Sequence, residues 1–292
     1  MSTTPSISSI HYPDYFRGKH LHIVSQHRKQ ESFEPALSGR LGFECETVTE
    51  VDTDLLGTFS GEVERTLAPL ECAREKCRQA LSYCRDGYLL ASEGSFGAHP
   101  TLGWVATGEE WVVFYDIKEQ FEVVVRNATL DTCFFGEHIT SEQLCLQFLQ
   151  KVGFPKQGII LKHTREHPQH ILKNLHTEQE VVDKVAEWLA SGTVPYIETD
   201  MRAMYNPTRQ RHLIQMGHLL ADSLGRICNA CGWYGFSVTS VERGLPCGCC
   251  GNATESVLAE IYTCKKCAHS ERKRFPRGIE QENPQFCNYC NP

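Results

Sequence analysis

Short apolar runs alternate along the chain with longer stretches of helical character. Continuous or period-two apolar runs are typical of strands, and they predict strands at residues 21–24, 43–48, 88–91, 111–115, 121–126 and 158–161, with an extended segment at 197–202. Helical periodicity and start signals predict helices at 29–41, from Pro69 to about 84, at 141–152, at 177–189 and at 207–224. The start signals are Pro69, a Thr177-x-x-Glu180 capping box and the Asn206-Pro207 pair.

This order of elements predicts the fold class. Strands and helices alternate over most of the chain, and the runs at 111–115 and 121–126 form one predicted antiparallel hairpin. We therefore expect an α/β fold with a mixed, mostly parallel sheet flanked by helices, and a small C-terminal zinc-ribbon-like module. The expected organisation is a polar leader at 1–19, an α/β domain at 20–225 and a zinc-binding module at 226–292.

Four Cys-x-x-Cys knuckles dominate the chemistry of the last part of the chain. Two such knuckles supply the four thiolates of a closed tetrahedral zinc site, so four knuckles predict two structural zinc ions. We expect the knuckles to pair in sequence order, with interleaved and nested pairings as alternatives. The eight expected ligands are Cys228, Cys231, Cys247, Cys250, Cys264, Cys267, Cys287 and Cys290.

The composition of the chain indicates the cellular compartment of the protein. No stretch approaches the roughly eighteen apolar residues of a membrane span, and the N-terminal segment has no long apolar run. Fifteen cysteines without a secretion signal fit a reducing compartment, so we expect a cytoplasmic protein without membrane contact. Six cysteines outside the knuckles are expected to be buried as small apolar groups: Cys45, Cys72, Cys77, Cys84, Cys133 and Cys145.

The net charge and the distribution of charged residues indicate which macromolecules the protein could bind. The formal net charge is −7, which is unlike a surface built for non-specific nucleic-acid binding. A local basic patch nevertheless occurs near the third knuckle, at Lys265, Lys266, Arg272, Lys273, Arg274 and Arg277. Aromatic residues near the knuckles could stack on bases of nucleic acid, or they could cover the metal sites as part of a small core. Nucleic acid or a protein is therefore a possible partner of the zinc module.

Residues 92–100 form the first candidate site outside the zinc module. They follow a predicted strand and combine Glu93 and Ser95 with glycines, a composition that suits a phosphate-binding loop at a strand end. The alternative is an ordinary tight turn.

Residues 198–209 form the second candidate site. Glu198 and Asp200 alternate on an extended segment and could hold magnesium, while Arg202 and Arg209 could bind phosphate oxygens. The alternative is a network of salt bridges that anchors the following helix.

Longer motifs carry a family resemblance. They are the string from Asp52 to Arg65, the segment 91–97, Glu198-Thr199-Asp200-Met201-Arg202-Ala203 with Asn206-Pro207-Thr208-Arg209, and the knuckles. Together these motifs resemble a bacterial family of domains of unknown function over roughly residues 20–292. The resemblance implies the fold and the boundaries, and it implies no reaction.

The N-terminal part is also similar, more weakly, to the inosine/xanthosine triphosphatases. That family has a phosphate loop after its opening strand, then a Ser-Gly segment, an acidic helix rich in Ala and a strand that ends in Glu-Gly-Gly. Segments 25–29, Ser60-Gly61, Glu71 with Ala73 and Lys76, and Glu93-Gly94 occur here in the same order. Gln26 and Ser95 depart from its pattern, since the family has Asn and Gly there, and it lacks both the 198–209 motif and the zinc module.

Two functions follow as hypotheses. The first is a magnesium-dependent hydrolase of a phosphorylated small molecule, such as a nucleoside triphosphate, with Glu93, Glu198, Asp200 and Arg202 as catalytic residues. Lys29, Ser60, Ser95 and Arg209 would bind its substrate. The second is a non-catalytic zinc-ribbon protein that binds nucleic acid or a protein partner.

Overall fold

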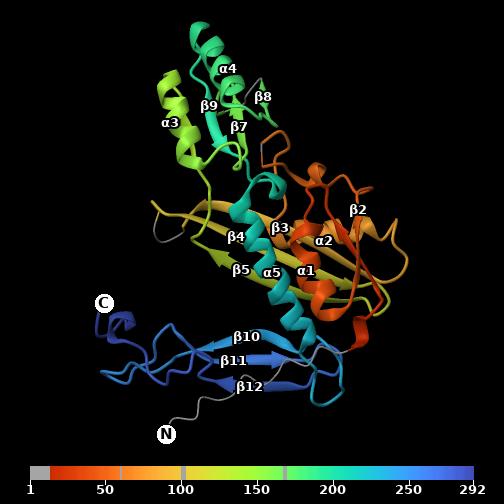
Figure 1. Cartoon of the computed structure of the whole chain (residues 1–292). Coiled ribbons are helices and arrows are strands. Elements are labelled where there is room, and N and C mark those ends of the chain that lie inside the picture. The colour runs from red at the N-terminus through yellow and green to blue at the C-terminus, as the bar shows by residue number, and fades with distance from the viewer. Residues whose placement is uncertain (1–13, 60, 100–102, 167–169) are drawn as a thin grey trace. The chain divides into compact units, whose positions relative to one another are not determined.

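A computed structural model describes the chain except for residues 1–13, 60, 100–102 and 167–169 (Figure 1). The chain forms two compact units. We call Phe16–Leu220 the large unit, and Ala221–Pro292 with Asp14 and Tyr15 the cysteine unit. No helix among the described residues has the length and apolar character needed to cross a membrane.

A five-stranded mixed sheet forms the centre of the large unit. Its strand order is β2-β1-β3-β4-β5. β1 is parallel to β2 and β3, whereas β3, β4 and β5 are successively antiparallel. The strands span β1 His20–Val24, β2 Glu44–Val48, β3 Tyr88–Ala98, β4 Ala106–Asp116 and β5 Phe121–Thr129. The predicted mixed α/β fold is confirmed.

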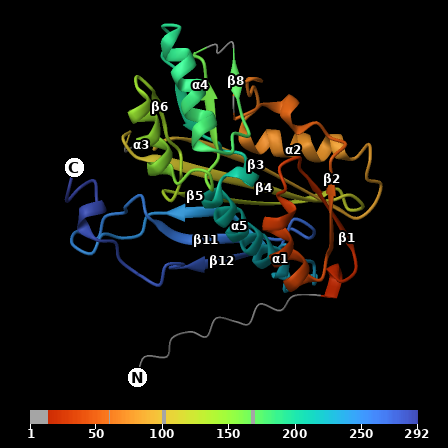
Figure 2. The same ribbon diagram turned by 45° about the horizontal axis from the view of Figure 1, so that its top comes forward.

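Helices cover both faces of this sheet because both faces are apolar. On one face, α2 (Pro69–Ala80) packs its small side chains against Leu89 and Ala91 of β3. On the other face, Tyr88 and Phe114 contact the rings of Phe16 and Phe43. α1 (Gln30–Leu41) and α5 (Pro207–Gly225) lie on that second side in the views of Figures 1 and 2. Gly217 of α5 allows the two helices to pack closely, because a Cβ at this position would lie 3.3 Å from the Cβ of Ala36 on α1.

A second, four-stranded sheet completes the large unit. Its order is β6-β9-β7-β8, and every pairing is antiparallel. The elements are β6 Gly136–His138, α3 Glu142–Val152, β7 Ile159–Lys162, β8 Ile171–Leu172, α4 Glu178–Ala190 and β9 Tyr196–Thr199. α3 and α4 share an apolar core with β7 and β9. The predicted capping box of Thr177 and Glu180 is confirmed at the start of α4.

Residues 92–98 of the segment expected to be a loop form a strand, so that prediction is wrong. β3 continues to Ala98 and pairs residue by residue with β4. Glycine and serine suggest a turn, but an antiparallel partner satisfies their backbone groups equally well. Gly94 is needed for close packing, because a Cβ there would lie 2.6 Å from Glu110 Oε1 and 2.7 Å from Arg209 Nη2.

The cysteine unit contains a three-stranded antiparallel sheet. Its strands are β10 Ser237–Arg243, β11 Val257–Thr263 and β12 Ser270–Arg274, in the order β10-β11-β12. Short 3-10 helices occur in both units at Asp14–Phe16, Thr53–Leu56, Ala203–Tyr205 and Pro284–Phe286.

Candidate functional site

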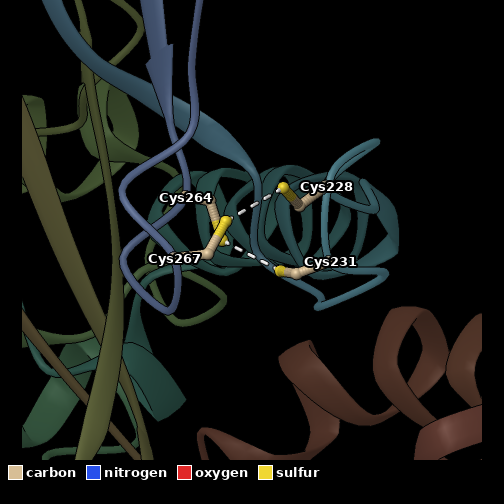
Figure 3. Close-up of side chains that lie close together, drawn as sticks. All are labelled: Cys228, Cys231, Cys264 and Cys267. Carbon is tan, nitrogen blue, oxygen red and sulfur yellow. Dashed lines mark hydrogen bonds between the residues drawn. The ribbon is translucent and has the colours of Figure 1, made fainter.

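The eight knuckle cysteines form two groups of four in the cysteine unit. Within each group the sulfur atoms all lie within 4.8 Å of one another, and either group could hold a metal ion. In the first group the Sγ atoms of Cys228 and Cys267 are 3.7 Å apart, and those of Cys231 and Cys264 are 3.6 Å apart (Figure 3). A tetrahedral ion with metal–sulfur bonds of about 2.3 Å requires sulfur–sulfur edges of about 3.8 Å. The four thiolates therefore fit a closed tetrahedral site.

The groups are interleaved, so the expected sequential pairing is wrong. Cys228 and Cys231 join Cys264 and Cys267, and the second group comprises Cys247, Cys250, Cys287 and Cys290. The reason is the antiparallel pairing of β10 and β11, which brings Ser237 next to Thr263 and so draws together the knuckles that flank this end of the hairpin. At the second group, a backbone bridge between Cys247 and Glu282 brings the remaining two knuckles together.

The large unit contains a separate cavity lined mainly by charged side chains. Its volume is about 30 Å³. The lining residues come from the segment after β1, the segment 53–59, α2, β3 and the segments after β8 and β9: His27, Lys29, Thr53, Asp54, Gly57, Thr58, Phe59, Lys76, Glu93, Lys173 and Arg202. Four of these side chains are lysine or arginine and two are carboxylic acids.

Glu93 lies in the wall of the cavity and is held by two cations. Its carboxylate pairs with Lys76 Nζ at 2.5 Å and also with Arg65. Burial alone would raise the pKa of Glu93, but Lys76, Lys29 and Arg65 outweigh burial and lower the pKa to about 2. Glu93 is therefore ionised at neutral pH, and both of its oxygens contact cations.

Lys29 is the most deeply buried cation of the cavity. It stands just before α1, and its Nζ donates hydrogen bonds to the Ser92 carbonyl oxygen at 2.9 Å and to the Ser92 hydroxyl at 3.0 Å. Burial lowers the pKa of Lys29 to about 7, and Lys76 and Arg209 add to this effect. Lys29 therefore titrates near neutral pH.

His27 and Asp54 form a pair at the same cavity. His27 Nε2 lies 3.5 Å from Asp54 Oδ1. Burial lowers the pKa of His27 to about 3, with a further contribution from Lys29, so the imidazole is neutral at pH 7. Burial also raises the pKa of Asp54, and the neighbouring Asp52 acts in the same direction.

Arg202 reaches the cavity because Asp200 positions it. Asp200 is buried, and its carboxylate accepts hydrogen bonds from Arg202 Nη2 at 2.7 Å and from the Arg202 backbone amide at 2.9 Å. Asp200 is not among the lining residues. Glu198 is directed to another cation, since its Oε1 lies 2.6 Å from Lys162 Nζ. The two carboxylates therefore bind different cations, and no shared metal position results.

The remaining expected substrate-binding residues lie elsewhere. Arg209 forms a buried ion pair with Glu110, with Nε 2.6 Å from Oε1, and it also donates to the Met201 carbonyl oxygen. Ser95 pairs with Glu109 in the β3–β4 ladder and does not line the cavity. Ser60 lies outside the described residues.

Sequence reasoning did not select several residues of the cavity. His27, Lys76 and Lys173, which line it, and Arg65, which pairs with Glu93, were assigned no role. Lys76 carried a usable signal, because it is next to Cys77 on the apolar stripe of α2, where a charged residue is unusual. No comparable signal marks Lys173, which reaches the cavity from the segment after β8.

Comparisons with known proteins identify the family of this chain. No curated protein and no solved structure matches the chain. A family model described as Domain of unknown function (DUF6671) matches residues 76–292, a segment that includes Lys76, Glu93, Arg202 and all eight knuckle cysteines. The chain therefore belongs to this family of domains of unknown function, as its motifs predicted.

Proposed function

We propose that the large unit is a hydrolase of a phosphorylated small molecule, with a nucleoside triphosphate as the first candidate, and that its cavity binds the reacting phosphate. The observation that carries this proposal is the excess of cations around the small cavity. Lys29, Lys76, Lys173 and Arg202 line it together with only two carboxylates, Asp54 and Glu93. Cations in a site of low dielectric stabilise the charge of a phosphoryl group during its transfer.

The geometry changes the roles expected of the carboxylates. Glu93 fixes Lys76 and Arg65, and Asp200 fixes Arg202, so both act on phosphate through the cations that they position. Magnesium, when bound, would neutralise phosphate oxygens, and we infer that it enters with the substrate. Of the two lining carboxylates, Asp54 is the one that forms no ion pair with a lysine or arginine among the described residues. Asp54 would therefore be the side chain that binds the magnesium ion.

His27 is suited to proton transfer in this reaction. Its imidazole is neutral at pH 7, so one ring nitrogen is free to accept the proton of an attacking water. A bound phosphate would offset the nearby cations that lower the pKa of His27, and would make the imidazole a stronger base. Asp54 would hold the ring in place through Nε2.

We infer that the metal ions of the cysteine unit are zinc and that their role is structural. Four thiolates fill a tetrahedral ion and leave no position for a substrate. A cytoplasmic location is consistent with so many thiols.

The cysteine unit also supports a second candidate function, the binding of nucleic acid or an acidic protein segment. All five residues of β12 are exposed, and Arg272, Lys273 and Arg274 are among them. Phe286 and Tyr289 expose 59% and 76% of their surface, which leaves their rings accessible to a partner. Binding that is absent at low salt would remove the nucleic-acid form of this candidate, because released counterions make such binding strongest there.

The test of hydrolysis is a screen of nucleoside triphosphates and sugar phosphates with and without magnesium. We expect release of phosphate from at least one substrate, and a loss of about 100-fold or more in Lys76→Met. Lys184→Met is the matched control, since Lys184 lies on α4, is not a lining residue of the cavity, and pairs with Glu187 at 2.5 Å. Full activity in Lys76→Met, or no hydrolysis by the folded, metal-loaded protein, would contradict the proposal.

A further inference from the structure

The size of the cavity limits what can enter it. Its volume is about 30 Å³, and one buried water needs about 10–15 Å³ on the same measure. The space therefore suits the oxygens of one compact anion, and a sugar ring or a nucleobase would have to remain outside. A phosphate that enters it must be an end group, because a diester carries organic substituents on two of its oxygens.

Lys29 differs from the other cations around the cavity in its partners. Lys76 and Arg65 pair with Glu93, Arg202 pairs with Asp200, and Lys173 pairs with Glu62. Within the described part of the chain, Lys29 has no carboxylate within 4.0 Å. Its ammonium group has three N–H donors, and the oxygens of Ser92 accept two of them. One donor and one uncompensated charge remain for a ligand.

The charged groups that act on Lys29 come from several elements. Lys76 on α2 and Arg209 on α5 lower its pKa, after burial itself, whereas Glu93 on β3 and Glu110 on β4 raise it. His27, in the same segment, is neutral at pH 7. The local balance thus lowers the pKa of Lys29, and a doubly charged anion in the cavity would raise it.

We propose that the cavity selects a terminal phosphate group with two negative charges, and that Lys29 is the residue that determines this selectivity. The substrate class is then phosphomonoesters and the end phosphates of polyphosphates, as opposed to diesters and carboxylates. This inference rests on the proposed function, since it specifies which phosphate the same cavity accepts. It also implies that Lys29 takes up a proton when the ligand binds above pH 7.

Calorimetric titration with methyl phosphate and dimethyl phosphate tests the selectivity. We expect the wild-type protein to bind the monoester at least about tenfold more tightly at pH 7.5, and Lys29→Met to lose most of this difference. Above pH 7 the affinity for the monoester should fall by up to about tenfold per pH unit, with uptake of up to about one proton measured in two buffers of different ionisation enthalpy. Lys29→Arg remains charged, so its affinity should be independent of pH from 7 to 9.

The results of these titrations distinguish the proposed phosphate site from its proposed selectivity for monoesters. Failure of the folded wild-type protein to bind methyl phosphate would contradict the phosphate site itself. Equal affinity for monoester and diester, or binding of the monoester without proton uptake at pH 8, would overturn the inference and leave the phosphate site in place. The proton measurement uses the wild-type protein, so it remains decisive even where a Lys29 variant does not fold. An unchanged monoester preference in folded Lys29→Met would also overturn the inference.

Discussion

Among the buried charged residues near the cavity, some line it and others only support those that do. Glu110 and Arg209 are the clearest supporting pair, because their side chains are 0% and 1% exposed and the pair lies between β4 and α5. Removing one partner of such a pair leaves an uncompensated buried charge, which is far more costly than breaking an exposed pair. The function of Arg209 is therefore structural in this account.

Substitution of Glu110 tests that assignment. Glu110→Gln should lower the free energy of unfolding by about 3–5 kcal/mol, because Arg209 would remain buried without a counter-charge. The neighbouring Glu109→Gln is a matched control, since Glu109 pairs with Arg126 at the surface, and it should cost less than about 1 kcal/mol. Chemical denaturation measures both values. Similar values for the two variants would show that the buried pair does not have this role.

The residue scale is where prediction from sequence was weakest. Lys29, Glu93 and Arg202 were candidates and do line one cavity, whereas Glu198 and Arg209 pair with Lys162 and Glu110. A sequence shows a charged residue but not its partner, and the partner of Arg209 is 99 residues away. Without partners, a carboxylate that positions a cation looks the same as one that binds a metal.

Elements were predicted better than single residues, because periodicity and capping are local. The capping box of α4 and the start of α5 at Pro207, where the Asn206 side chain accepts a hydrogen bond from the Arg209 amide, are confirmed. Pairing between elements is not local. This explains both errors at this scale, since the extension of β3 depends on β4, and the grouping of the knuckles depends on the β10–β11 hairpin.

Double substitutions test the interleaved grouping. Cys228→Ser with Cys264→Ser removes two ligands from one group, so the purified protein should hold one metal ion per chain by native mass spectrometry, compared with two for the wild type. Cys228→Ser with Cys247→Ser removes one ligand from each group and should weaken both. Loss of both ions in the first variant and of only one in the second would favour sequential pairing.

The whole molecule combines two units with different sources of stability. The large unit has extensive apolar cores around two sheets, whereas the described core of the cysteine unit is small, with Phe236 and Trp233 packed beside Cys228 and Cys264. Small units of this kind usually depend on metal ions for their fold. The proposed phosphate site lies in the large unit, and we expect the fold of the cysteine unit to depend on its metal ions.

The most direct test of this account is a crystal structure of the protein soaked with tungstate, a doubly charged tetrahedral oxyanion that anomalous scattering identifies. We predict one tungstate in the cavity, with oxygens within hydrogen-bond distance of Lys29, Lys76 and Arg202, and with the Glu93 and Asp200 ion pairs intact. A cavity that contains only water under these conditions would contradict the central claim. So would a magnesium ion bound directly by Glu93 and Asp200 in a parallel soak, because their ion pairs would then have been replaced by metal coordination.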